Sequence, residues 1–147
     1  MENIIRNIEG VLDTEVGYTS GQLVNPTYAD VATGRTGHAE AVQVVFDPII
    51  LSYEKFLDYL FRMHDPTTLN REENDVGTQY RSAIFYTSPK QKESAERVKE
   101  RVDLSHRWEA PVVTEVVAAS RFYPAEEYHQ NYLIKNPYGY NCHHLRE

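Results

Sequence analysis

Residues 34–47, with the sequence GRTGHAEAVQVVFD, decide how this chain folds. The stretch begins with glycines, which are typical of a turn, and continues as a strand in which apolar and polar residues alternate. Val42, Val44 and Phe46 share one face of this strand, and Glu40 lies on the same face. Because the more apolar face is expected to point inward, Glu40 should lie at the mouth of the core.

A carboxyl group at the mouth of a core loses hydration, and this loss raises its pKa. An acid that stays protonated near neutral pH can donate a proton, so Glu40 is a candidate general acid. The alternative is that Glu40 ends its strand and turns toward solvent, because buried acids are rare in proteins.

The composition is that of a globular protein with one domain, which we expect to span residues 1–147. The formal net charge is -7, and no basic run compensates it, which argues against a nucleic-acid partner. No apolar stretch is long enough to cross a bilayer, and no signal peptide is recognised. By default, the protein is expected in the cytoplasm.

Hydrophobic periodicity predicts helices and strands that alternate along the chain. Helices are predicted over residues 1–8, 52–64, 89–102 and 124–136, and strands over residues 11–18, 38–47, 80–86 and 112–119. Two long polar connections, residues 19–36 and 67–78, separate some of these elements, and connections of this length are usually functional. The pattern predicts a mixed sheet packed by helices, in the α/β or α+β class.

Two acids and two tyrosines fall in these connections or at the starts of the strands after them. Tyr28 and Asp75 lie in the connections, whereas Glu40 and Tyr80 begin the predicted strands. If the two strands are neighbours, the four side chains meet at one end of the sheet, where clefts form in such folds. Their spacing in the sequence does not by itself establish that they meet.

Cys142 is the only cysteine, so no disulfide can form within the chain. A thiol beside His143 and His144 is either redox-active or an exposed group without a role. A metal site built from these three residues and His129 would lack the usual ligand spacing, so no metal is expected. A thiol-dependent hydrolase that uses Cys142 with a histidine is a further alternative, but no Gly-x-Ser-x-Gly elbow is present.

Several motifs, taken in order over almost the whole chain, resemble the peptide methionine sulfoxide reductase A family. They are GYTSG (17–21), NPTY (25–28), GRTGHAEAV (34–42), NDVGTQYRSAI (74–84), FYPAEEYHQNYL (122–133) and KNPYGY (135–140). The resemblance implies a mixed-sheet two-layer α/β sandwich with flanking helices and a ferredoxin-like core, whose first central strand is missing from these residues.

The resemblance also implies an activity, the reduction of methionine S-sulfoxide, free or in proteins, to methionine. It assigns proton donation to Glu40, binding of the sulfoxide oxygen to Tyr28 and Tyr80, and ordering of the polar pocket to Asp75. Cys142 would be the resolving thiol. The implied partners are methionine sulfoxide in peptides or proteins and thioredoxin, with no prosthetic cofactor and with dithiothreitol as a substitute reductant.

One departure from the family concerns its nucleophile, which lies in a Gly-Cys-Phe-Trp-Gly segment that these residues lack. The residues from Met1 onward resemble the family sequence immediately C-terminal to that segment. We therefore expect an N-terminally incomplete domain whose nucleophile is a cysteine or, because a selenocysteine codon reads as a stop, a selenocysteine. The upstream reading frame would decide between them. The alternative is a catalytically inactive remnant that still binds methionine sulfoxide.

Overall fold

The computed structural model describes residues 1–139, 143, 145 and 146. Its longest pairing is antiparallel, between β1 (Val11–Thr19) and β2 (Ala39–Phe46), and β7 (Phe122–Pro124) pairs with the other side of β1. The order β2-β1-β7 places β1 in the middle, so both of its edges are hydrogen-bonded along part of its length.

The predicted alternation along β2 is confirmed. Val42, Val44 and Phe46 are half-buried, whereas Gln43 and Val45 are exposed. The face that carries the three apolar residues is therefore the one that turns inward, as its composition predicts.

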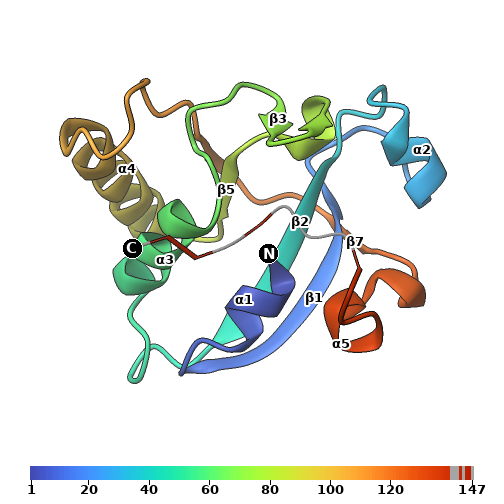
Figure 1. Cartoon of the computed structure of the whole chain (residues 1–147), viewed down its shortest axis with the longest axis horizontal. Coiled ribbons are helices and arrows are strands. Elements are labelled where there is room, and N and C mark those ends of the chain that lie inside the picture. Colours follow the sequence, from blue (N-terminus) through green and yellow to red (C-terminus); the bar gives the residue numbers. More distant parts are fainter. Residues whose placement is uncertain (140–142, 144, 147) are drawn as a thin grey trace.

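A second sheet is parallel. It joins β5 (Ala83–Tyr86) to β6 (Glu115–Ala118), and α4 (Pro89–Leu104) makes the crossover between them. The helix α3 (Tyr53–Met63) packs beside α4, and Figure 1 shows the two helices together on one side of the molecule. The buried apolar residues of this part form the main core, which contains Leu57, Phe61, Ile84, Ala95 and Val98.

Both long helices begin where the sequence predicts. The Ser52 hydroxyl accepts a hydrogen bond from the N–H of Lys55 at 3.2 Å, and the Ser88 hydroxyl accepts one from Gln91 at 3.2 Å. Pro89 takes the first helical position of α4, where its missing N–H costs nothing.

The connection 19–36 contains a helix that the periodicity does not predict, α2 (Tyr28–Ala32). Its cap is a reciprocal pair. The Thr27 side chain accepts a hydrogen bond from the N–H of Asp30, and the Asp30 carboxylate accepts one from the N–H of Thr27. The sequence carries this capping signal, but five residues are too few to show helical periodicity.

The single helix predicted over residues 124–136 is wrong. This region forms the short 3-10 helix η2 (Glu127–His129) and the helix α5 (Tyr132–Lys135), separated by an extended Gln130. The Gln130 side chain accepts a hydrogen bond from the N–H of Val16 and donates one to its carbonyl, both at 2.8 Å. These contacts with β1 hold the chain extended where local preference favours a helix.

The remaining elements are short. They are α1 (Glu2–Arg6), β3 (Arg71–Glu72), β4 (Asp75–Val76) and the 3-10 helix η1 (Thr78–Tyr80). The strands β3 and β4 form a small antiparallel hairpin within the second polar connection. Tyr80 lies in η1 and not at the start of β5, so its predicted place on a strand is wrong by three residues.

Within the described residues, β2 and β5 each pair with one strand only, so the two sheets stay separate. Parallel and antiparallel pairs packed by helices confirm the predicted mixed α/β class. No helix in the described part of the chain is both long enough and apolar enough to span a membrane.

Candidate active site

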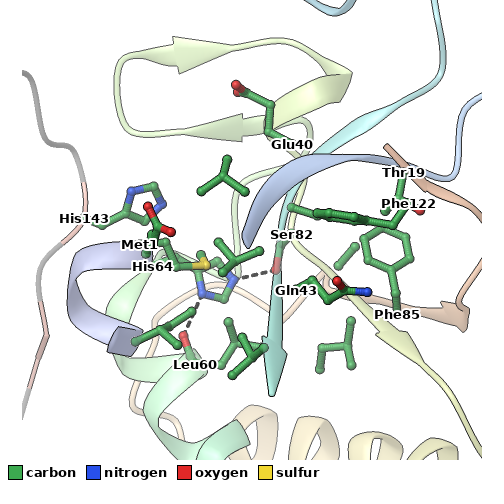
Figure 2. Close-up of a pocket in the computed structure, with 18 of the residues that line it drawn as sticks. Met1, Thr19, Glu40, Gln43, Leu60, His64, Ser82, Phe85, Phe122 and His143 are labelled. Atoms are coloured by element: carbon green, nitrogen blue, oxygen red, sulfur yellow. Dashed lines mark hydrogen bonds between the residues drawn. The ribbon is translucent and has the colours of Figure 1, made fainter. Parts of the chain in front are cut away.

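A cleft of about 540 Å³ lies between the two sheets (Figure 2). Side chains of β2 and β5 form two of its walls, and apolar residues of α3 line it as well, among them Phe56, Leu57 and Leu60. This space separates the edges of β2 and β5 that pair with no strand among the described residues, and its walls are mainly apolar with a few polar groups. Glu40 lies at one end of the cleft, and its carboxyl group points away from His64.

Glu40 reaches this end of the cleft from β2, where it lies directly opposite Tyr18 of β1. Loss of hydration, followed by the negative charge of Asp75, raises the pKa of Glu40 from its ordinary 4.5 to about 7. Glu40 as a whole residue is nevertheless exposed, so this acid both lines the cleft and reaches solvent. The sequence prediction of an acid at the mouth of the core describes this position.

Asp75 and Tyr80 line the same cleft as Glu40. They come from β4 and η1, which the β3–β4 hairpin brings over the end of β2. Burial, followed by the charge of Glu40, raises the pKa of Tyr80 to about 12, so its phenol stays protonated and can donate a hydrogen bond at neutral pH. The structure therefore brings these three predicted residues together.

Tyr28, the fourth predicted residue, begins α2 at the edge of this group. Tyr28 lies close enough for its charge to raise the pKa of Tyr80, although the residue is 38% exposed. The ring of His129 packs against it, with 4.6 Å between the ring centroids. Tyr28 is therefore next to the cleft without being one of its lining residues.

The sequence suggests His129 only as a possible metal ligand, whereas the structure places it in the cleft wall. His129 lines the cleft, contacts Tyr28, and has a buried Nε2 atom without a hydrogen-bond partner among the described residues. Burial lowers the pKa of His129, so the ring is neutral at pH 7. The sequence signal that could have identified His129 is its position in the motif FYPAEEYHQNYL, directly before Gln130, which binds the backbone of β1.

A buried chain of hydrogen bonds that the sequence did not predict crosses the cleft wall. His64 Nδ1 lies 2.8 Å from the Leu60 carbonyl, His64 Nε2 lies 2.6 Å from Ser82 Oγ, and Ser82 Oγ lies 2.7 Å from Thr114 Oγ1. Since the carbonyl can only accept, Nδ1 carries the proton and Ser82 donates to Nε2. This Ser–His pair is buried, and a carbonyl orients the imidazole, so the pair ties α3 to β5 and β6.

The predictions for Cys142 and His144 lie outside the described residues. His143 lines the same cleft as Glu40. Among the described side chains, no group of three His, Cys, Asp or Glu is arranged to hold a metal ion.

Comparison with known proteins gives one consistent answer. A family model described as peptide methionine sulfoxide reductase matches residues 1–147. Peptide methionine sulfoxide reductase MsrA of Methanothermobacter thermautotrophicus is 52% identical over 93% of this chain and 81% of its own length.

Two solved structures agree with this match. Reduced Mxr1 of Saccharomyces cerevisiae is 37% identical, with a TM-score of 0.93 over 99% of this chain and 85% of that chain. Methionine sulfoxide reductase A of Corynebacterium diphtheriae is 38% identical, with a TM-score of 0.88 over 95% of this chain and 71% of that chain. The sequence, the fold and the family model together show that the chain belongs to the peptide methionine sulfoxide reductase family, a family of oxidoreductases.

Proposed function

We propose that this chain serves the reduction of methionine S-sulfoxide, free or in proteins, to methionine, with Glu40 as the proton donor. The observation that carries the proposal is a carboxyl group with a pKa of about 7, beside Tyr80, at one end of an apolar cleft. The side chain of methionine sulfoxide is apolar except at its S–O group. A cleft with apolar walls and proton donors at one end suits such a side chain.

The reaction joins a nucleophilic step to a proton transfer. A thiolate or selenolate attacks the sulfoxide sulfur, and the oxygen takes a proton from Glu40. The attack joins the nucleophile to the substrate sulfur, and the protonated oxygen leaves that sulfur as water after taking a second proton. Water then adds to the attacking atom and breaks the new bond, which releases methionine and a proton and leaves a sulfenic or selenenic acid. A second thiol then condenses with that acid, water leaves, and thioredoxin or another dithiol reduces the resulting bond.

The phenols of Tyr80 and Tyr28 are proposed to donate hydrogen bonds to the sulfoxide oxygen. Tyr80 is suited to this role because its pKa of about 12 keeps the phenol protonated. Asp75 is proposed to order the polar end of the cleft, since its charge is one of the two causes that raise the pKa of Glu40. Cys142 is proposed as the resolving thiol.

A second candidate function, binding of methionine sulfoxide without turnover, is favoured by the single cysteine of the 147 residues. A reductase assay with dithiothreitol and a methyl sulfoxide separates the two functions. We expect no turnover from these 147 residues alone, and turnover once a Gly-Cys-Phe-Trp-Gly segment and the strand before it are placed ahead of Met1. In that active form, Glu40→Gln should lower turnover about 10²- to 10⁴-fold, as loss of a general acid typically does. Unchanged turnover would remove Glu40 from the mechanism.

Binding tests the site independently of turnover. Calorimetry on the 147-residue chain should show preference for a peptide with methionine S-sulfoxide over the R epimer and over methionine. Binding should weaken as the pH rises through about 7, because Glu40 then loses the proton it donates. Glu40→Gln should remove this pH dependence, since an amide donates at every pH.

The matched control is Glu127→Gln, because the Glu127 side chain is 89% exposed and outside the cleft. This variant should bind like the unmodified chain at every pH. Equal affinity for both epimers and for methionine would contradict the proposed function.

A further inference from the structure

The Glu126 carboxylate links two segments that lie about a hundred residues earlier in the chain. Its Oε1 atom accepts a hydrogen bond from the Tyr18 hydroxyl at 3.0 Å, and its Oε2 atom accepts one from the N–H of Tyr28 at 2.9 Å. Partial burial acts to raise the pKa of Glu126, but hydrogen bonds from the Tyr28 N–H and the Tyr18 hydroxyl outweigh it and lower that pKa. The group is therefore an ionised acceptor for both donors at neutral pH.

The Tyr18 end of this link is rigid. Tyr18 is 1% exposed, it lies in the middle strand of its sheet, and it is paired with Glu40 on one side and Tyr123 on the other. Burial, followed by the hydrogen bond to Glu126, raises the pKa of Tyr18 far above its ordinary value, so the hydroxyl remains a donor. Glu126 is thus attached to the residue that faces the candidate proton donor across the β1–β2 pair.

The Tyr28 end lies on a short helix whose Val31 is 1% exposed and packs with Tyr18 and Ala125. Tyr28 begins this five-residue helix within a polar connection, and the residue is 38% exposed. The far end of α2 is held by Gln79, which donates to the Ala32 carbonyl at 3.5 Å. The near end is held by the bond to Glu126 and by the ring of His129, three residues further along. Figure 1 shows α2 and α5 on the same side of β1, away from α3 and α4.

We propose that Glu126 is a positioning residue that fixes Tyr28 relative to Glu40. The inference rests on the proposed function, because it explains how a tyrosine in a polar connection keeps a constant place beside an acid on a strand. Glu126 does not line the cleft and acts through Tyr28 and Tyr18.

The first test measures the order of Tyr28 directly. In the 147-residue chain, Glu126→Ala should lower the ¹⁵N order parameter of the Tyr28 amide from about 0.85 to below about 0.6, as for a flexible segment. Glu126→Gln should keep Tyr28 ordered, because its amide can accept from the Tyr28 N–H and donate to the Tyr18 oxygen. Glu127→Ala, which removes the exposed neighbouring carboxylate, should leave Tyr28 unchanged.

The second test asks whether this order serves binding. Glu126→Ala should weaken binding of a methionine S-sulfoxide peptide about tenfold, the cost of one lost hydrogen bond. The same change in a Tyr28→Phe background should have little further effect, because Glu126 acts through Tyr28.

Two outcomes would overturn the inference. One is a Tyr28 amide that stays ordered in Glu126→Ala, and the other is a Glu126→Gln variant as mobile as Glu126→Ala. If Tyr28 becomes mobile in Glu126→Ala but the unmodified chain does not bind the sulfoxide, the positioning role stands and the proposed function fails.

Discussion

Two parts of this molecule are stabilised in different ways. The helical part, which consists of α3, α4, β5 and β6, buries five apolar residues in one cluster. The β1 part, which consists of β1, β2, β7, α2 and residues 125–131, has a smaller cluster of Tyr18, Val31 and Ala125. Side chains such as Gln130 and Glu126 join its segments through hydrogen bonds to the backbone.

This difference separates stability from positioning. Apolar burial is strong and non-directional, so it stabilises the fold without fixing the orientation of one group. Hydrogen bonds are weaker on balance but directional, so they can fix the place of a catalytic side chain. The candidate proton donor, Glu40, belongs to the β1 part and faces a wall supplied by the helical part.

The largest expected effect is on stability and belongs to the helical part. Leu57 is 1% exposed in its cluster, so Leu57→Ala should lower the free energy of unfolding by about 2–5 kcal/mol. Urea denaturation measures this loss. The control is Leu104→Ala at the end of α4, where the side chain is 65% exposed and the change should stay within about 0.5 kcal/mol. Similar losses for both variants would mean that this cluster is not the main source of stability.

A smaller effect is expected in the β1 part. Gln130→Ala leaves the N–H of Val16 without its partner, whereas the Val16 carbonyl keeps the N–H of Ala125, and the loss should cost about 1–3 kcal/mol. NMR shifts should change at Tyr28 as well, because His129 precedes Gln130 and packs on that ring. The exposed residue Gln22 provides the control, since Gln22→Ala should change neither quantity. A change of stability without any change at Tyr28 would break the distinction between the two parts.

The pH dependence of stability sharpens the comparison further. Glu40 has a folded pKa of about 7 against an ordinary 4.5, so the folded state binds more protons than the unfolded state between these values. Stability should therefore fall as the pH rises through this window. Because Glu40 is exposed on one side, solvent screening should limit its share to about 1 kcal/mol.

Denaturation midpoints between about pH 4 and pH 8 measure this loss. Glu40→Gln should show a smaller fall than the unmodified chain. Some fall should remain, because burial also raises the pKa of Glu72 to about 7. Identical curves for the two proteins would show that Glu40 is fully hydrated.

The smallest effect is expected on the surface of the helical part. Asp58 and Arg101 form an ion pair between α3 and α4 at 2.5 Å, with side chains that are 48% and 51% exposed. Asp58→Asn should lower the free energy of unfolding by no more than about 0.5 kcal/mol, because exposed pairs gain little. A loss comparable to that of Leu57→Ala would mean that charge, and not apolar burial, joins the two helices.

Much of the fold can be predicted from local patterns. The caps at Ser52 and Ser88, and the alternation of apolar residues along β2, depend on neighbours within a few residues. Glu40, Asp75 and Tyr80 line one cleft, but not for the predicted reason, because β2 and β5 belong to separate sheets and Tyr28 is not among the lining residues. The predicted last helix failed where Gln130 binds the backbone of β1.

The sequence by itself determined the strand that carries Glu40, the two long helices and the family, because each depends on local periodicity or on motifs in order. Only the tertiary structure decided that Glu126 bonds to Tyr28, that His129 packs on the same tyrosine, and that His64 joins Ser82. The physical reason is that these contacts join residues far apart in the chain. A polar side chain that binds a distant backbone group leaves no periodic trace in the sequence.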